Sequence, residues 1–253
     1  MKLEGRSAIV SGGGRGIGRG IALELARAGA SVAINYRRDE DAAQETVSAM
    51  REMGRESFAF QADVRESEKV EAMVEKAIDT FGKVDILVCN AGIASRGNYL
   101  ADTDVTEMRR VLDIHLFGAL HFARGLLPHM REHQRSDIHF ISSTTTLLNE
   151  AGHMPYATAK ACLDTLAMTM AKDERRYGIR VNIIAPGLVE TDMGRRLMRA
   201  VRGVEDIKDL YPEYPFGRIC QPEDIGKLSA FLASEDGGYV SGHVIYLDGG
   251  MAR

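Results

Sequence analysis

The sequence contains no tryptophan and only three cysteines among its 253 residues. Cys89, Cys162 and Cys220 are odd in number and far apart, so neither a disulfide framework nor a zinc-binding cysteine pair follows. The first residues lack the apolar core of a signal peptide, and no apolar run reaches the ~18–20 residues of a membrane span. We therefore expect a cytoplasmic protein with reduced thiols and no membrane contact.

The sequence also lacks an excess of basic residues. It has 32 Lys and Arg against 36 Asp and Glu, a net charge of −4, whereas a general nucleic-acid binder carries a basic face. Prolines number only 6 but glycines 26, which indicates tight turns and close backbone approaches rather than low-complexity linkers. We expect a globular chain with a sizeable core and no nucleic-acid partner.

Short apolar runs alternate with longer segments of helical periodicity. The expected strands are residues 7–10, 31–36, 58–61, 84–89, 138–141, 180–184 and 244–247. The expected helices are residues 17–28, 40–53, 70–81, 105–131 and 156–177, with Pro128 bending or ending the fourth. This alternation predicts an α/β fold with a doubly wound parallel sheet covered by helices on both faces. No linker interrupts it, so we interpret residues 1–253 as one domain.

Residues 188–218 break this alternation, and we call this segment the lid. A long irregular insert after a strand is typical of a cover over a site. The segment carries Arg195, Arg196, Arg199 and Arg202. These arginines either favour an anionic or carrier-bound substrate or are simply solvated.

A glycine-rich turn follows the first expected strand and opens the first expected helix. Its spacing is Gly-x-x-x-Gly-x-Gly, with Gly12, Gly16 and Gly18 as the glycines and Arg15 and Ile17 between them. Residues without a Cβ let backbone N–H groups approach a diphosphate, and a helix N-terminus favours negative charge. We interpret the turn as the diphosphate site of a dinucleotide; the alternative is a glycine-rich turn without a ligand.

The end of the second expected strand selects the nucleotide. Sites for NAD place Asp or Glu about 20 residues after the glycine turn, on the ribose 2′-OH, but this strand ends Asn35-Tyr36-Arg37. Arg15 and Arg37 can pair with a 2′-phosphate by charge-assisted hydrogen bonds. We therefore expect NADP(H) to be preferred, with NAD(H) as the alternative if Asp39 reaches the ribose.

Further motifs occur in a specific order along nearly the whole chain. They are Asp63-Val64, Asn90-Ala91-Gly92, Ser143 thirteen residues before Tyr156, Tyr156-x-x-x-Lys160, Pro186-Gly187 with Thr191, and Asp248-Gly249-Gly250. Together with the glycine turn, they make the sequence resemble the short-chain dehydrogenase/reductase family in its single-domain branch. The resemblance implies a Rossmann-type sheet of about seven strands, a nicotinamide cofactor and a homotetramer.

Tyr156 and Lys160 are the expected catalytic pair. They lie four residues apart and share one helix face. A free tyrosine has a pKa of about 10, and a lysine cation ~4 Å away at an effective dielectric of ~20 would contribute about 4 kcal/mol toward the phenolate. We expect Lys160 to lower the pKa of Tyr156, which would be the acid in reduction and the base in oxidation. Ser143 would hydrogen-bond the substrate oxygen, unless a shifted register gives that role to Thr144.

The resemblance assigns the remaining contacts with the cofactor. It implies that Lys160 also holds the nicotinamide ribose, that Asp63 and Val64 contact the adenine, and that Val189 and Thr191 meet the nicotinamide carboxamide. The other residues that it implies at the cofactor are Asn90, Ala91, Gly92, Pro186 and Gly187. The Asp248-Gly249-Gly250 motif is implied to be structural.

Two histidine features stand apart from these assignments. Where the family has an asparagine that anchors a water in a proton relay, this sequence has His115. Histidine titrates near neutral pH, so His115 replaces that asparagine in the relay, packs without a catalytic part, or marks an impaired relay. His129 and His133 have a metal-compatible i, i+4 spacing, but no third ligand is evident. We interpret them as a solvated pair and expect no metal.

Three functions are compatible with these residues. Within the family, the sequence is most similar to the 3-oxoacyl-thioester reductase type, which implies an NADP(H)-dependent reductase of a small-molecule ketone, thioester-bound or free. Gln134 with Arg135, and Arg175 with Arg176 before Tyr177, are displaced by one position from the basic residues that dock an acyl carrier protein in such reductases. The alternatives are an alcohol or sugar dehydrogenase working in oxidation and a catalytically silent nucleotide-binding sensor.

Overall fold

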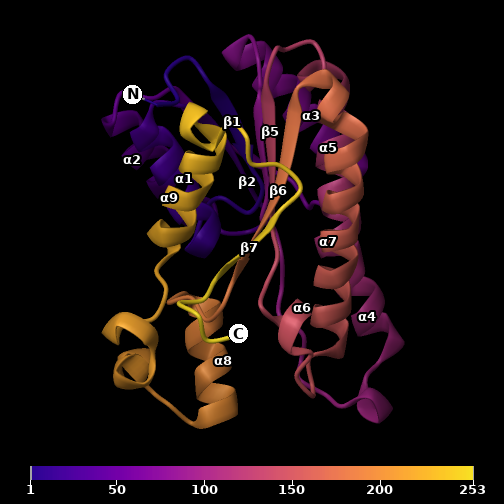
Figure 1. The fold of residues 1–253 in the computed structure, drawn as a ribbon, viewed down its shortest axis with the longest axis vertical. Helices are drawn as coiled ribbons and strands as arrows, with labels where there is room; N and C mark the ends of the chain where they lie inside the picture. The colour runs from indigo at the N-terminus through magenta and orange to yellow at the C-terminus, as the bar shows by residue number, and fades with distance from the viewer. Residues whose placement is uncertain (1, 253) are drawn as a thin grey trace.

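A seven-stranded parallel sheet forms the centre of the protein in the computed structural model, which describes residues 2–252 (Figure 1). The strand order is β3-β2-β1-β4-β5-β6-β7, and every neighbouring pair is parallel. The strands are β1 (Ser7–Val10), β2 (Ser31–Tyr36), β3 (Ser57–Gln61), β4 (Ile86–Cys89), β5 (Ser136–Ile141), β6 (Ile179–Pro186) and β7 (Val244–Leu247). The predicted fold class is confirmed.

The residues of β1, β4 and β5, and all but one of those of β6, are buried, so helices must cover both faces of the sheet. One face packs on α1 (Gly16–Ala28), α2 (Glu40–Glu52) and α9 (Pro222–Ala233). The other packs on α3 (Ser67–Phe81), α5 (Gly118–Met130) and α7 (Met154–Glu174). No helix within residues 2–252 is long and apolar enough to span a bilayer.

The expected helix at 105–131 is divided. It consists of α4 (Val105–Leu112), a π-helical turn (Asp113–Phe117) and α5. Pro128 lies inside α5, which ends two residues later at Met130. A π turn inside a helix adds a residue locally and is common at functional sites. Here it carries His115.

The lid is more regular than expected. It contains helix α8 (Asp192–Arg202) and the 3-10 segments Ile207–Glu213 and Pro215–Gly217. Two short elements lie outside the lid: α6 (Thr145–Leu148) after β5 and the 3-10 turn Leu100–Asp102 before α4. Helix α9 was not among the expected elements, although Pro222 opens it.

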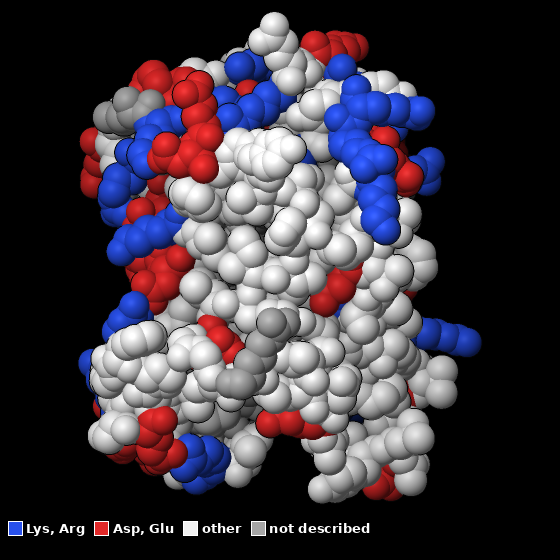
Figure 2. Space-filling view, in the orientation of Figure 1, with Lys and Arg blue, Asp and Glu red and all other residues white. Residues whose placement is uncertain are grey.

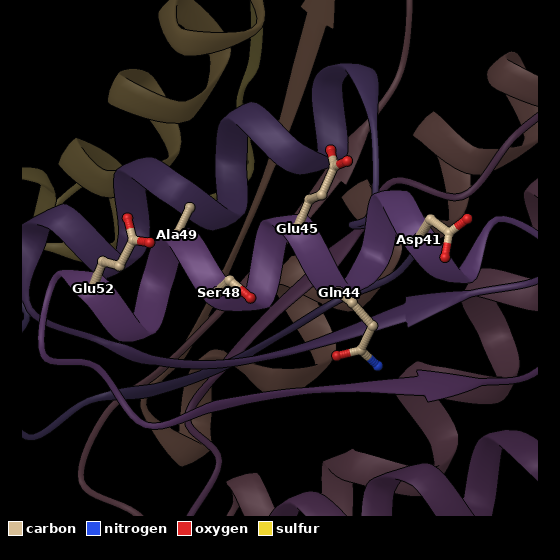
Figure 3. Close-up of a pocket in the computed structure, with 6 residues that line it drawn as sticks. All are labelled: Asp41, Gln44, Glu45, Ser48, Ala49 and Glu52. Carbon is tan, nitrogen blue, oxygen red and sulfur yellow. The ribbon is translucent and has the colours of Figure 1, made fainter.

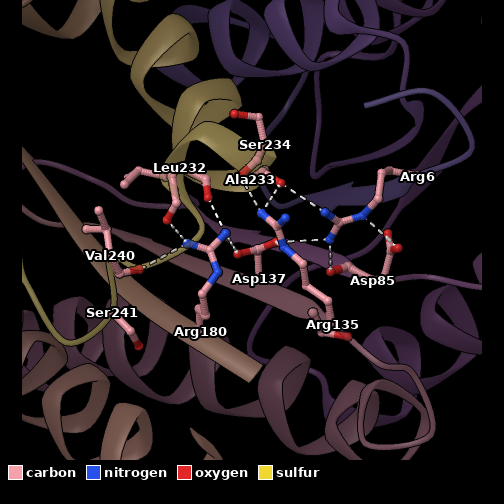
Figure 4. Close-up of polar contacts among 12 residues, drawn as sticks. Arg6, Asp85, Arg135, Asp137, Arg180, Leu232, Ala233, Ser234, Val240 and Ser241 are labelled. Atoms are coloured by element: carbon pink, nitrogen blue, oxygen red, sulfur yellow. Dashed lines mark hydrogen bonds and ion pairs between the residues drawn. The ribbon is translucent and has the colours of Figure 1, made fainter. Parts of the chain in front are cut away.

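A buried charge cluster connects the end of the sheet where β5 begins to α9 (Figure 4). Asp137 on β5 is fully buried and forms ion pairs with Arg6 (3.0 Å), Arg135 (3.4 Å) and Arg180. Arg135 also donates to the carbonyl of Ala233 at the end of α9 (2.7 Å). Asp137 is the second residue of β5, and Ser143 follows the other end of this strand. Arg135 therefore lies at the end of the sheet away from Ser143.

Candidate functional site

The predicted site residues meet at the carboxyl ends of four neighbouring strands. The glycine turn follows β1, Asn90–Gly92 follow β4, Ser143 follows β5, and Gly187 follows β6. Between β1 and β4 the strand order changes direction, and ligands of open parallel sheets bind outside the strands at such a point. The topology therefore brings together segments that are widely separated in sequence.

The glycine turn lies against the exit of β4. Gly12 has φ +64°, and a Cβ there would lie 3.1 Å from Ala91 Cα and 3.2 Å from Asn90 Nδ2. A Cβ at Gly18 would lie 2.2 Å from the Gly12 carbonyl oxygen. The Asn90 amide donates to the Ser11 carbonyl (2.9 Å), which explains why a polar residue follows β4 at this position.

The N-terminus of α1 has the properties of an anion site. Its N-cap residue, Arg15, makes no side-chain cap, and no acidic residue lies in the first turn. The first N–H groups of a helix have no intrahelical partner and carry partial positive charge. The turn at Gly16, Ile17 and Gly18 therefore fits a diphosphate, as the sequence predicts. Thr191 from the lid reaches this turn, since a Cβ on Gly16 would lie 3.4 Å from Thr191 Cγ2.

Two arginines extend the positive charge toward the end of β2. Arg15 Nη1 lies 3.9 Å from Asp39 Oδ2, and Arg37 Nη1 lies 3.9 Å from Asp63 Oδ2. Their side chains are 64% and 41% exposed, so both can turn to a ligand. Asp39 instead accepts a hydrogen bond from the Ala42 amide and caps α2 (3.3 Å).

The predicted adenine residues differ in their surroundings. Asp63 is held by Arg65, whose guanidinium contacts both carboxylate oxygens (2.6 and 3.0 Å) and keeps the pKa of Asp63 below its usual range. Val64 is only 6% exposed and packs into the core, because Gly118 leaves room for its side chain. The predicted contact of Val64 with the adenine stays a prediction.

The sequence interpretation missed one polar residue of the cofactor end. The Asn35 side chain on β2 accepts from the Gly12 N–H (3.2 Å) and donates to the Ala62 carbonyl (2.8 Å). It therefore fixes the glycine turn relative to β3. A buried asparagine inside an otherwise apolar strand is the signal that could have found it.

The proposed catalytic residues lie together on α7 and at the end of β5. Lys160 is buried and donates to the Ile141 carbonyl (2.6 Å), and its Nζ lies 5.6 Å from the centre of the Tyr156 ring. Burial lowers the pKa of Lys160 to about 8, while the carboxylate of Asp164, one turn further along α7, acts in the opposite direction. The side chain of Ser143 hydrogen-bonds Tyr156.

The expected lowering of the Tyr156 pKa is wrong for this arrangement. Burial raises the pKa of Tyr156 to about 12, and only the hydrogen bond from Ser143 opposes it. The buried phenolate would lose its hydration, and the charge of Lys160 makes no contribution that offsets this loss. Tyr156 is therefore protonated throughout the neutral range.

His115 lies against Tyr156 and within electrostatic reach of Lys160. It is 3% exposed, and its ring meets the Tyr156 ring edge-on with centroids 5.3 Å apart. Burial, together with the charge of Lys160, lowers the pKa of His115 to about 3. Its Nε2 pairs with the backbone of Ile93, 3.0 Å from N and 2.8 Å from O, while Nδ1 is buried without a partner among the described residues. A Cβ at Gly92 would lie 2.4 Å from its Cε1.

At β6, Thr191 accepts a hydrogen bond from the Gly194 amide (3.1 Å) and caps α8, and Val189 forms a bridge with Cys220. Gly187 lies directly after β6, where a Cβ would be 3.2 Å from the Asp248 side chain. Pro186 ends the strand. These residues join the lid to the end of the sheet that carries Ser143.

The second histidine feature also differs from expectation. The rings of His129 and His133 are in contact, with the two Nε2 atoms 3.1 Å apart, and the Val84 amide donates to His129 (3.1 Å). The pair is therefore half-buried rather than solvated. Across residues 2–252, no group of three or more His, Cys, Asp or Glu side chains could hold a metal ion.

A surface depression on the outer face of α2 is separate from these residues (Figure 3). It is lined by Asp41, Gln44, Glu45, Ser48, Ala49 and Glu52. Their side chains project from one helix only, and three of them are acidic. We assign no function to this depression.

Comparison with known proteins gives consistent matches along the chain. Residues 12–252 match the family model described as "Enoyl-(Acyl carrier protein) reductase". A 3-oxoacyl-[acyl-carrier-protein] reductase of Staphylococcus epidermidis is 36% identical, covering 97% of this chain and 98% of the relative. A hydroxynaphthalene reductase of Aspergillus fumigatus is 38% identical, covering 96% and 90%. The crystal structure of a short chain dehydrogenase from Burkholderia cenocepacia in complex with NADP has a TM-score of 0.89 at 31% identity and covers 99% of both chains.

Proposed function

Since the chain belongs to the short-chain dehydrogenase/reductase family of oxidoreductases, we propose that it is an NADPH-preferring reductase of a 3-oxoacyl thioester or a related ketone. The observation that carries the proposal is the convergence of Ser143, Tyr156 and Lys160 beside an uncapped helix N-terminus. The names of the two reductase relatives support the reductive direction.

The residues of the site fit a nicotinamide dinucleotide. The amides of Gly16, Ile17 and Gly18 would hold the diphosphate, and Arg15 and Arg37 would hold a 2′-phosphate. The remaining contacts would come from Asp63, Val64, Asn90, Ala91, Gly92, Lys160, Pro186, Gly187, Val189 and Thr191. When bound, the cofactor supplies the hydride for reduction.

The protein's own residues supply the proton and hold the substrate oxygen. Ser143 would donate a hydrogen bond to that oxygen as negative charge develops on it. Tyr156, protonated at neutral pH because burial raises its pKa, would then transfer its proton to the oxygen. The alternative is an alcohol or sugar dehydrogenase working in the oxidative direction, in which Tyr156 would act as the base.

The silent-sensor alternative has less support because Ser143 hydrogen-bonds Tyr156 and the Lys160 ammonium lies 5.6 Å from the centre of the Tyr156 ring. The homotetramer and the cytoplasmic location stay predictions. In favour of assembly, Tyr99 and Leu100 are 68% and 74% exposed and line a depression with the outer face of α7.

The first experiment is consumption of NADPH and NADH with acetoacetyl-CoA and a panel of simple ketones, with Tyr156→Phe as the control. We expect NADPH to be used well above NADH and the control to be inactive. Turnover of simple ketones alone would remove the thioester from the proposal. Tight NADPH binding without any turnover would favour the sensor, and faster reduction of NADP⁺ by alcohols or sugars would favour the dehydrogenase.

A further inference from the structure

A largely buried carboxylate lies at the base of the lid. Glu190 follows β6, and its side chain is only 13% exposed. The Tyr211 hydroxyl (2.6 Å) and the Gln221 side-chain amide (2.8 Å) both donate to its Oε2, and Arg195 Nη1 lies 3.7 Å from its Oε1. The hydrogen bond from Tyr211, supported by Gln221 and Arg195, holds the pKa of Glu190 below its usual range. The group is therefore a carboxylate at neutral pH.

The three donors belong to three different elements. Tyr211 lies in the 3-10 segment Ile207–Glu213 and Arg195 lies in α8, so both are part of the lid. Gln221 is the N-cap residue of α9, a helix that packs on the sheet. Through these contacts, Glu190 joins the helical segments of the lid to the part of the protein that encloses the sheet.

The lid projects from the end of the sheet at which β6 ends. In Figure 1, α8 lies beyond the strands, and the space-filling view shows this region as a lobe at the lower left (Figure 2). The lobe has a small apolar core of its own, which consists of Ile207, Leu210 and Ile219. Because this core lies within the lobe, the orientation of the lid relative to the sheet depends on the contacts at its base, where Glu190 lies.

The backbone at Glu190 also leads to the cofactor end of the sheet. The Glu190 N–H donates to the Cys220 carbonyl (2.9 Å). The next residue, Thr191, caps α8 and reaches the glycine turn after β1, where a Cβ on Gly16 would lie 3.4 Å from its Cγ2. In the proposed function, the nicotinamide half of the cofactor extends from this turn toward Ser143. It would therefore pass beside Thr191, the immediate neighbour of the carboxylate.

We propose that Glu190 is a positioning residue that couples the lid to the nicotinamide half of the cofactor. This assignment rests on the NADP(H)-dependent function proposed above. While Tyr211 and Gln221 are bound to the carboxylate, the lid and Thr191 share one fixed arrangement. A nicotinamide beside Thr191 selects this arrangement and so orders the lid. Such coupling is reciprocal, so loss of the carboxylate weakens the contribution of the nicotinamide to binding and leaves that of the adenine half unchanged.

The test compares NADP⁺ with 2′-phospho-ADP-ribose, which lacks the nicotinamide, by calorimetric titration. Glu190→Gln keeps the size of the side chain, removes its charge and places an amide NH₂ among groups that are themselves donors. We expect this variant to bind NADP⁺ roughly three- to tenfold more weakly. Its affinity for 2′-phospho-ADP-ribose should equal that of the parent.

Two further variants define the contact that is responsible. Tyr211→Phe removes one donor of the same carboxylate and should weaken NADP⁺ in the same direction but less. Added to Glu190→Gln, it should cause little further loss because the two residues share one hydrogen bond. Glu205→Gln is the matched control, since this lid carboxylate is 79% exposed and pairs only on the surface with Arg199. Neither affinity should change in the control.

Hydrogen exchange of the lid gives a second readout that does not depend on turnover. In the parent, saturating NADP⁺ should slow the exchange of amides in residues 204–218, and 2′-phospho-ADP-ribose should not. In Glu190→Gln, saturating NADP⁺ should lose most of this protection. If Glu190→Gln does not fold, Tyr211→Phe, which removes a single hydroxyl, is measured in its place.

The possible results separate this assignment from the proposed reductase activity. Equal weakening of the two ligands by Glu190→Gln, or an effect of the same size in Glu205→Gln, would overturn the assignment. Unchanged NADP⁺ affinity together with unchanged lid protection would also overturn it, even if the parent reduces ketones. If the coupling is observed but the parent reduces no ketone, the role of Glu190 stands and the reductase activity fails. A parent that binds neither ligand overturns both.

Discussion

Replacing Arg37 with alanine should weaken NADPH much more than NADH. Its guanidinium lies 3.9 Å from Asp63 and is 41% exposed, so in a solvent-like dielectric this pair contributes only about 1 kcal/mol. A phosphate monoester carries about −1.5 to −2 charges and forms charge-assisted hydrogen bonds worth about 1.5–3 kcal/mol before exposure is considered. After discounting for solvent and for the lost pair with Asp63, we expect the variant to lose about 1–2 kcal/mol of NADPH binding free energy, which is a roughly five- to thirtyfold loss of affinity.

The assay is the ratio of kcat/KM for NADPH to that for NADH, measured for the parent, Arg37→Ala and Arg15→Ala. Arg27→Ala, at the far end of α1 where it pairs with Glu24, controls for the loss of a positive charge in general. The ratio should fall for Arg37 and Arg15 and stay constant for Arg27. An unchanged ratio in both site variants, or an equal loss for both cofactors, would refute the 2′-phosphate argument.

Four further results are expected. His115→Asn should leave the pH–rate profile between pH 5 and 9 unchanged, because the pKa of His115 is lowered to about 3. A change of slope near pH 6.5 seen only in the parent would show that the histidine carries a proton. The oxidative kcat/KM should climb with pH through the alkaline range because the pKa of Tyr156 is about 12, and a plateau below pH 8 would contradict that. Asp137→Asn should cost about 3–5 kcal/mol in urea unfolding, since it leaves buried guanidiniums unpaired; a loss below 1 kcal/mol would show that the cluster relaxes. Burial lowers the pKa of His139 from 6.5 to about 3, so the folded state binds fewer protons than the unfolded state between these pH values. The free energy of unfolding should therefore fall as the pH falls from 6.5 toward 3. It should fall less steeply in His139→Gln.

The sheet could be predicted from sequence because each strand contains a short run of mainly apolar residues. The β2 and β7 bounds match the expectation, and β5 and β6 are longer by two or three residues. Register-dependent features could not be predicted. The π turn at Asp113–Phe117 accommodates His115 beside Tyr156, which is a tertiary contact with no local periodicity signal.

The positions of the site residues were predictable, but their electrostatics were not. The four-residue spacing correctly places Tyr156 and Lys160 on one helix, but the sign of the tyrosine pKa shift depends on burial, which a sequence does not display. The lid arginines are another case, because their carboxylate partners lie up to eleven residues away, as between Arg202 and Glu213. Helix α8 was not predicted for the same reason, since its charged side chains form ion pairs within the lid.

The contact between Gly92 and His115 constrains the order in which this site can change. Because a Cβ at position 92 would lie 2.4 Å from the imidazole, any larger residue there is incompatible with the present histidine. A smaller side chain at position 115 has to appear first, and only then is position 92 free to vary. The histidine thus makes mutational paths through this part of the cofactor region directional, so that the same pair of substitutions is tolerated in one order and harmful in the other.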